Sequence, residues 1–496
     1  MKKILNSIQM KELENNTIEN IGIDGVVLME RAAYEVSKEI IASFDINKSI
    51  LIACGTGNNG ADGLCVARHL IEKGYKPHVF INFGHSQTDL FIRQKKILDN
   101  LKCDFVDSIE FHDIFVDALL GIGIKGNIDD NTLNIIKKIN SYHSHVISLD
   151  IPSGLDASSG LSMPEAIKSN VTYTFGAYKS GLFYKDAVNY TGKVFLKDIG
   201  IFDADLPFEA YMLEENDISI LNEIRINNSN KSTYGKVLTV AGSKKMCGCA
   251  ILSSLASFKC GIGMVKIITH KNNLNAIMNS LPEAMLGLYD DTNSISETDF
   301  KDACEWSDVI LCGPGIGTDS TAQMLTLYAL NIINKSVILD ADALNCLSIN
   351  SFCQERIKNR LPYTTIITPH KGESKRLLEA FKVDTLEELS DLLKIIIVDK
   401  DAKTKIIGRE NYINNSGNNG MSTAGCGDVL SGIIASITGF YEKGLLNCSI
   451  ERATALAVFL HGATADYAVN ESKESGLIAS EIADNIPRYL FNIDNK

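Results

Sequence analysis

The chain has 496 residues, a formal net charge of −13 and 45% hydrophobic residues, which excludes both a single small domain and a basic nucleic-acid-binding surface. Its 12 cysteines form no C-x-x-C pair, and no apolar run reaches membrane-spanning length. We therefore expect a cytoplasmic protein with reduced thiols, and neither a membrane nor a nucleic acid as partner.

Short apolar runs alternate with helical patterns in the first half of the chain. After an amphipathic region at 29–44, strands are expected at 49–54, 78–83, 115–119, 145–150 and 171–175. Such alternation predicts a parallel sheet covered by helices on both faces, in a first α/β domain over 1–210.

The polar segment 205–232 is rich in Asn, Glu and Ser, and it predicts a connector between two domains. A second alternation follows, with strands expected at 236–241, 264–269, 309–312, 337–339, 365–368 and 394–398. A helical tract covers roughly 428–439 and 451–469. The pattern predicts a second doubly wound α/β domain over 215–496.

A glycine-rich loop joins the first of these strands to a helical pattern. Gly55, Gly57 and Gly60 form G-x-G-x-x-G, the dinucleotide fingerprint, which favours phosphate binding at a helix N-terminus. A dehydrogenase would carry an acidic residue about 20 residues further on, at the end of the second strand, but this strand is expected to end at 83 and the first acidic residue after it is Asp89. The loop therefore predicts a Rossmann-like domain that holds a dinucleotide without hydride transfer.

Two later strands end in similar chemistry. Asp117 closes one strand before a glycine turn, and Asp150 closes another before Pro152-Ser153-Gly154. Because ligands bind outside the carboxyl ends of parallel strands, these loops are expected to converge with Asn59. Amide, hydroxyl and carboxylate oxygens suit a hard cation, although each Asp taken singly can equally be a helix N-cap.

The runs GNNGADG, DALLGIGIKG, SLDIPSGLDASSG and TYTFGAYKSGL together resemble the YjeF N-terminal family, the epimerase domain of NAD(P)H-hydrate repair enzymes. The resemblance implies that Asp150 is the catalytic acid/base and that Asn59, Asp117 and Ser153 bind K⁺. The residues that it implies for NAD(P)HX binding are Asp150, Asn58, Asn59, Gly60, Ala61, Asp62, Gly121, Ile122, Gly123, Ile124, Lys125, Gly126 and Asn127. Ala61 departs from the family, which usually has glycine there.

A second glycine-rich loop, Gly425-Cys426-Gly427-Asp428, opens the helical tract in the second half. Its carboxylate can be an N-cap or a base beside a transferring phosphoryl group, and the loop alone leaves both open. GCGD resembles the G-x-G-D of ribokinase-like kinases, in which the Asp deprotonates the acceptor hydroxyl.

Other segments narrow the choice of family. CGPGIG at 312–317, DADALN at 340–345 and TPHKGE at 368–373, together with GCGD, resemble the nucleotide-dependent NAD(P)HX dehydratases. The resemblance implies a ribokinase-like domain in which Asp428 is catalytic. It also implies that Ala250, Gly317, His370 and Asp428 contact the hydrate, and that Lys400, Asp401, Ala402, Lys403, Thr404 and Gly427 contact ADP or ATP. Asp401, where the family has glycine, adds a negative charge near the phosphates, and 246–249 also departs from the family.

The sequence therefore predicts a bifunctional enzyme that epimerises R- and S-NAD(P)HX and dehydrates the S form to NAD(P)H. The expected cofactors are K⁺ in the first domain, and Mg²⁺ with ADP or ATP in the second. Its expected partners are the small molecules NADHX and NADPHX, and we expect a homo-oligomer. Two alternatives stay open: a ribokinase-like small-molecule kinase fused to a ligand-binding domain, and a first domain that binds without catalysis.

Overall fold

The structure, a computed structural model, describes residues 1–83, 86–123, 126, 128–203, 205–290, 295–469 and 473–494. The chain divides into two compact units. One unit is Lys2–Ala210, and the other consists of Tyr211–Lys496 together with Met1. Each unit is built around its own sheet, and each is described separately below.

The N-terminal unit contains a parallel sheet with the strand order β4-β3-β2-β5-β6-β7-β9. Every neighbouring pair in this sheet is parallel. The order reverses between β2 and β5, and such a switch point is where open α/β sheets bind ligands. The strands are β2 (Ile50–Cys54), β3 (His78–Ile81), β4 (Asp104–Val106), β5 (Ile114–Ala118), β6 (His145–Leu149), β7 (Val171–Phe175) and β9 (Lys193–Lys197).

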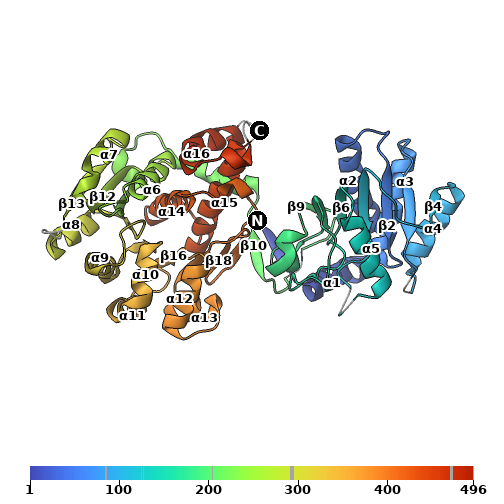
Figure 1. Cartoon of the computed structure of the whole chain (residues 1–496), viewed down its shortest axis with the longest axis horizontal. Coiled ribbons are helices and arrows are strands. Elements are labelled where there is room, and N and C mark those ends of the chain that lie inside the picture. The colour runs from blue at the N-terminus through green and yellow to red at the C-terminus, as the bar shows by residue number, and fades with distance from the viewer. Residues whose placement is uncertain are drawn as a thin grey trace. The chain divides into compact units, whose positions relative to one another are not determined.

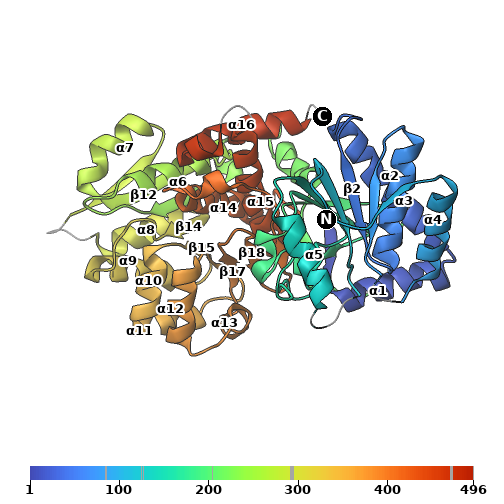
Figure 2. The same cartoon turned by 45° about the vertical axis from the view of Figure 1, so that its right-hand side comes forward.

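Alternate residues of each central strand face opposite layers of helices. In β2, Ile50, Ile52 and Cys54 join the core beneath α2, α3 and α4, whereas Leu51 and Ala53 join the core beneath α5. Figure 2 shows this layering, with β2 between α2 and α5. The helices are α1 (Ser7–Asn15), α2 (Gly25–Ser43), α3 (Asn58–Glu72), α4 (Asp89–Asn100) and α5 (Asp130–Asn140). The expected doubly wound domain is confirmed.

A small additional pair of strands supports α1. In this pair β1 (Lys2–Leu5) runs parallel to β8 (Tyr178–Lys179), and Leu5 pairs with Lys179. Leu5, Met10, Leu13 and Ala177 form a separate apolar cluster there. The pairing brings α1 and the chain after β7 into the same region of the unit.

The C-terminal unit repeats the same winding. Its strand order runs β13-β12-β11-β14-β15-β16-β17-β18-β19, and β10 pairs with β19 through Tyr211 and Tyr412. Pairs from β13 to β17 are parallel, whereas β17–β18 and β18–β19 are antiparallel, so the sheet is mixed. The strands are β10 (Ala210–Met212), β11 (Lys236–Val240), β12 (Met264–His270), β13 (Met285–Tyr289), β14 (Val309–Cys312), β15 (Ser336–Leu339), β16 (Thr365–Ile367), β17 (Ile396–Asp399), β18 (Lys405–Ile407) and β19 (Tyr412–Ile413).

Two cores lie on the two faces of this sheet. One core packs α6, α7 and α14 to α16 against residues such as Val237 and Leu311, and the other packs α8 to α13 against Leu238 and Ile310 (Figure 1). The helices are α6 (Gly248–Lys259), α7 (Leu274–Ser280), α8 (Glu297–Trp306), α9 (Ser320–Asn331), α10 (Asp342–Ile349), α11 (Ser351–Lys358), α12 (Lys371–Phe381), α13 (Leu386–Leu393), α14 (Cys426–Glu442), α15 (Ile450–Ala468) and α16 (Ala479–Asp494).

Most of the expected connector is folded into the C-terminal unit. Residues Glu215–Ile224 form a short 3-10 helix, η4, and Lys231–Tyr234 form a second one, η5. Ile218, Leu221 and Ile224 are buried in the core with α16. The apolar residues of η4 recur at every third or fourth position and face the core, so the polar residues lie on its outer face. The polar composition of 205–232 therefore does not indicate a free linker.

Candidate functional sites

The glycine loop after β2 brings α3 close to the sheet. A Cβ at Gly55 would lie 2.0 Å from the carbonyl oxygen of Leu119, and a Cβ at Gly60 would lie 1.9 Å from that of Gly55. A Cβ at Gly57, the N-cap of α3, would contact nothing within 4 Å. Two glycines of the fingerprint are therefore required by packing, and only Gly57 lies where a ligand can approach the helix N-terminus.

The three residues expected to bind K⁺ lie together at the switch point. The side-chain amide of Asn59 donates to Leu120 O at 2.8 Å, and Ser153 Oγ accepts from Leu120 N at 2.9 Å. Ser153 Oγ also donates to Asp117 Oδ1 at 2.5 Å. The predicted convergence of Asn59, Asp117 and Ser153 is thus present in the structure.

The side-chain oxygen atoms of Asp117 and Asn59 differ in how many hydrogen bonds they accept. Asp117 is buried and accepts four hydrogen bonds, from Ser148 Oγ, from the amide and hydroxyl of Ser153, and from Leu119 N. Burial raises the pKa of Asp117, and these hydrogen bonds oppose that rise. Asn59 Oδ1, in contrast, is buried without a hydrogen-bond partner. An orphaned oxygen beside the carbonyl of Leu120 is the feature that fits a cation.

Asp150 follows β6 and is held in an unusual backbone conformation, with φ of 64°. Its Oδ1 accepts from Phe175 N at 3.1 Å, from Thr174 Oγ1 at 3.3 Å, and from the ammonium group of Lys179. A non-glycine residue at positive φ costs free energy and occurs preferentially at functional sites. The chain therefore fixes this carboxylate at the carboxyl edge of the sheet.

Two further carboxyl groups lie near this ion pair. Burial raises the pKa of Asp62, in the first turns of α3, and repulsion from Asp150 and Glu14 adds to the rise. Glu14 on α1 behaves similarly, because burial and Asp150 raise its pKa while Lys179 and Lys11 oppose the shift. Three carboxyl groups thus lie around one buried ammonium group, and burial with mutual repulsion raises the pKa of two of them, Asp62 and Glu14.

The remaining expected hydrate contacts of the N-terminal unit differ in what they can offer. The side chain of Ala61 is buried in the apolar core, so only its backbone can contact a ligand, and the extra methyl does not narrow the loop. A Cβ at Gly121 would lie 3.1 Å from Asn59, and Ile122 packs against the α1 cluster. Asn58, Gly123 and Gly126 are described, whereas Ile124, Lys125 and Asn127 lie outside the described residues.

In the C-terminal unit, Asp428 lies in the first turn of α14, directly after Gly425 at φ of 90°. Burial raises the pKa of Asp428 to about 7, with repulsion from Asp340 and Asp342 adding to the rise and Lys400 opposing it. A carboxyl group that titrates near neutrality suits a general base better than a simple helix cap.

Asp340 is the centre of this site. It is buried, and its Oδ1 accepts from Thr368 Oγ1 at 2.6 Å, from Lys400 Nζ at 2.8 Å and from Ala341 N at 2.9 Å. These partners follow three adjacent strands, β15, β16 and β17. A Cβ at Gly427 would lie 3.6 Å from Lys400 Nζ, so α14 begins beside the same ammonium group.

The other residues expected to contact the hydrate, Gly317, His370 and Ala250, differ in which of their groups can reach a ligand. The backbone N–H of Gly317, at φ of 83°, donates to Asp342 Oδ2 at 2.9 Å. His370 caps α12, with Nδ1 accepting from Gly372 N at 2.9 Å, and its ring is largely exposed. The side chain of Ala250 is buried in the core, so only its backbone, in the first turn of α6, can contact a ligand.

The expected nucleotide residues 400–404 form the turn between the antiparallel strands β17 and β18. Asp401 pairs with Lys371 at 2.9 Å and accepts from Ala402 N at 2.8 Å. The negative charge of Asp401 is therefore paired with the positive charge of Lys371, and this pairing reduces its repulsion toward phosphates. Lys403 donates to Asn415, and Thr404 Oγ1 donates to Asp401 O at 3.2 Å.

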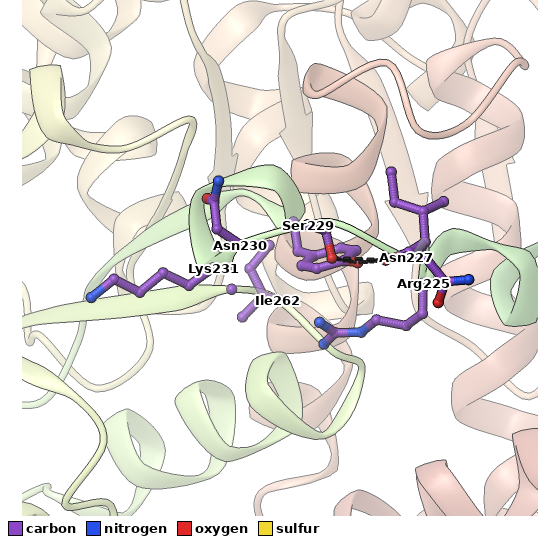
Figure 3. A pocket seen from close by; sticks show the side chains of 9 residues that line it. Arg225, Asn227, Ser229, Asn230, Lys231 and Ile262 are labelled. Atoms are coloured by element: carbon purple, nitrogen blue, oxygen red, sulfur yellow. Dashed lines mark hydrogen bonds between the residues drawn. The ribbon is translucent and has the colours of Figure 1, made fainter.

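A cavity of about 520 Å³ lies elsewhere on the C-terminal unit, between the end of η4 and Ile262 (Figure 3). The guanidinium of Arg225 lies 4.0 Å from the centre of the Tyr234 ring and donates to Gly261 O at 2.6 Å. Ser229 contacts the Tyr234 hydroxyl. These contacts anchor the segment after η4, and none of the expected site residues lines the cavity.

Sequence reasoning missed three of the most informative residues. Asp340 follows β15 in the same way that Asp150 follows β6, so the strand-end rule would have found it. Lys179 and Glu14 carried no comparable signal. They reach Asp150 only through β8 and α1, which are neither long nor strongly patterned.

Each unit therefore presents carboxylates at the carboxyl edge of a doubly wound sheet, beside a glycine-rich helix start. This arrangement defines a two-domain α/β enzyme that acts on nucleotide-like ligands. Residues 237–488 match the family described as NAD(P)H-hydrate dehydratase, and residues 25–181 match the YjeF-related protein N-terminus. The chain belongs to the family of bifunctional NAD(P)H-hydrate repair enzymes.

The chain is similar to the following proteins. The bifunctional NAD(P)H-hydrate repair enzyme Nnr of Thermofilum pendens is 30% identical, over 98% of this chain and 96% of its own. A ribokinase-like superfamily protein from Enterococcus faecalis is 29% identical, covers 59% of this chain and 99% of its own, and has a TM-score of 0.50. An ADP/ATP-dependent NAD(P)H-hydrate dehydratase from Bacillus subtilis, co-crystallised with ATP/Mg²⁺, is 28% identical over 58% of this chain and 100% of its own, with a TM-score of 0.47. Across the described residues, the helices are too short or too polar to cross a membrane.

Proposed function

We propose that the two units carry out consecutive steps in the repair of hydrated nicotinamide dinucleotides. The N-terminal unit epimerises R- and S-NAD(P)HX, and the C-terminal unit dehydrates the S form to NAD(P)H with ADP or ATP. The observation that carries the proposal is the pair of carboxylates, Asp150 and Asp428, each fixed at a strand or helix end where a parallel sheet binds ligands.

In the N-terminal unit, Asp150 is the acid/base group. Inversion at the hydrated carbon requires that its hydroxyl gain a proton and leave as water, and that water return to the opposite face and lose a proton. Asp150 exchanges that proton, while the start of α3 and the turn after β5 hold the dinucleotide. The carboxyl cluster of Asp62 and Glu14 provides further proton capacity beside it.

We assign K⁺ to Asn59, Asp117 and Ser153. Asn59 Oδ1 lacks a partner, and the neighbouring oxygens are carbonyl, hydroxyl and a single carboxylate. Low ligand charge suits a large monovalent cation better than Mg²⁺, which requires near-ideal octahedral geometry. K⁺ would supply positive charge that fixes the three loops and offsets the phosphates of the substrate.

In the C-terminal unit, Asp428 accepts the proton of the substrate hydroxyl as that oxygen attacks a phosphoryl group. The transfer releases ADP from ATP, or AMP from ADP. The phosphorylated oxygen then leaves as phosphate while the neighbouring ring carbon loses a proton to solvent, and the double bond of the nicotinamide ring is restored. Lys400 and the N–H groups at the start of α14 stabilise the transferring charge. Asp340 keeps Lys400 oriented toward Gly427.

Three carboxyl groups interact at this site, those of Asp340, Asp342 and Asp428, and Lys400 is the cation that opposes the rise in the pKa of Asp428. Because these negative groups outnumber that cation, the site fits Mg²⁺. When bound with ADP or ATP, Mg²⁺ would neutralise phosphate charge. The turn 400–404 and Gly427 would hold the nucleotide, and Gly317, His370 and the first turn of α6 would hold the hydrate.

The test is to incubate the protein with mixed NADHX epimers and Mg²⁺, with ATP or ADP, and to follow the absorbance of reduced nicotinamide. Conversion of more than the S fraction indicates both activities. No rise with either donor would refute the dehydratase, and ATP use that yields only a phosphorylated small molecule would support the kinase alternative. Light scattering on the purified protein tests the expected homo-oligomer, and parallel assays with NADPHX test its substrate preference.

A further inference from the structure

Lys179 is a lysine that the fold buries almost completely, with a side chain only 1% exposed. Its ammonium group donates to Asp150 Oδ1, to Phe175 O at 2.7 Å and to Thr174 Oγ1 at 3.1 Å. An ammonium group has three protons, and here all three are committed to the protein. Lys179 therefore has no proton left with which to hold a substrate.

The partner of Lys179 is constrained on one oxygen only. In the described part of the chain, the bonds from Thr174 Oγ1, Phe175 N and Lys179 all reach Oδ1 of Asp150. The second oxygen, Oδ2, takes part in none of them. Together with the positive φ of Asp150, this pattern fixes the plane of the carboxylate and leaves one oxygen for a ligand.

The charged groups around Asp150 come from several elements. Glu14 and Lys11 lie on α1, Asp62 lies on α3, and Lys179 lies on β8. The two neighbouring carboxyl groups repel a negative charge on Asp150, whereas Lys179 attracts it. Without Lys179, the repulsion between Asp150 and these two carboxyl groups would no longer be offset by that ammonium group.

We propose that Lys179 is the positioning residue of the epimerase site. Its ammonium group holds Oδ1 of Asp150 and so presents Oδ2 as the atom that exchanges a proton with the substrate. This inference rests on the proposed function of Asp150, and it adds a residue that acts through Asp150 without touching the substrate.

The experiment compares Lys179→Met with Lys197→Met in the full chain. Lys197 is a control from the same unit, because its ammonium group pairs with Glu39 and not with Asp150. The assay first consumes S-NADHX through the dehydratase activity of the chain and then records conversion of the remaining R form from pH 5 to pH 9. We expect Lys179→Met to lower epimerisation at pH 7 by about 10²-fold or more. Its acid limb should also move to higher pH, while dehydration stays normal.

A merely structural role would lower the amount of folded protein without moving the pH profile of the fraction that folds. Lys179→Arg, which keeps the charge, should restore the wild-type acid limb even where the rate stays low. If Lys179→Met does not fold, Lys179→Gln decides, because it removes the positive charge beside Asp150 while keeping a polar side chain, and it should lower kcat with KM unchanged. A wild-type rate and acid limb in Lys179→Met, or in Lys179→Gln where that variant decides, would overturn the inference.

Asp150→Asn separates this inference from the proposed function. If Asp150→Asn still epimerises, the role given to Asp150 is wrong, whatever Lys179 does. If Asp150→Asn is inactive while Lys179→Met behaves as wild type, the proposed function stands and only the role of Lys179 fails.

Discussion

A single carboxyl group carries the proposed chemistry of the C-terminal unit, and its removal should separate catalysis from folding. We expect Asp428→Asn to reduce dehydration by about 10²–10⁴-fold, the usual cost of losing a general base. Nucleotide binding should persist, because Gly427, Lys400 and the turn 400–404 remain. Turnover near the wild-type rate would show that Asp428 only caps α14.

The same substitution has a consequence for stability that depends on pH. Because the pKa of Asp428 is raised to about 7 in the folded state, this state holds a proton that the unfolded state releases near pH 4. The contribution of Asp428 to the free energy of unfolding therefore falls as the pH rises from about 4 to 7. Asp428→Asn should be more stable than wild type at pH 8 by on the order of 1–3 kcal/mol, and unchanged at pH 4. Urea unfolding at both pH values measures this difference.

Asp117 tests the cation site of the N-terminal unit. With its four hydrogen bonds removed, Asp117→Ala should lose the alignment of Ser153 with Asn59, and epimerisation should fall and cease to respond to K⁺. Dehydration of the S form is the internal control. Equal conversion of the R form with and without K⁺ in the wild type would refute the assignment of K⁺ to this site.

At the scale of elements, the start of α3 offers a matched pair of glycines. Gly60→Ala places a methyl group 1.9 Å from Gly55 O, so β2 and α3 must separate, and the N-terminal unit should lose at least about 2 kcal/mol. Gly57→Ala meets no atom within 4 Å and should leave the melting temperature unchanged. If the phosphates lie against Gly57, this variant should raise KM. A stable Gly60→Ala protein would contradict the packing argument.

The elements that the sequence predicted well are those with long buried strands. β2, β5, β6 and β7 were expected within one residue at each end, because both faces of these strands are covered and nearly all of their residues are buried. The edge strands β4 and β9 were missed, since they contain Asp104, Lys193 and Lys197 and are only partly buried.

The same reasoning separates the site residues that sequence could find from those that it could not. Asp117, Asp150 and Ser153 belong to strand ends, which converge in any parallel sheet. Lys179 contacts Asp150 from β8, a two-residue strand that pairs with β1 more than 170 positions away, and no local pattern encodes this contact. The fold class could therefore be predicted from the sequence, whereas the pairing of Lys179 with Asp150 could not.

At the scale of the whole molecule, the position of the boundary decides whether the halves survive separation. Residues 211–496 include β10 and η4, whose Ile218, Leu221 and Ile224 are buried in the core. We expect 1–210 and 211–496, expressed apart, to be folded and to show epimerase and dehydratase activity respectively. A fragment that begins at 225 should aggregate or melt several degrees lower. Failure of 211–496 to fold would mean that the units depend on one another.

The three strand ends joined at Asp340 have a consequence for the thermodynamics of ligand binding. Thr368, Lys400 and Ala341 N all donate to one carboxylate oxygen, so groups of the protein itself fix the floor of the site. A preformed site loses little conformational entropy on association, and binding energy is then available for the substrate in its reactive form. Folding of α14, α15 and the sheet already restricts these groups, so nucleotide binding removes little further conformational entropy from them.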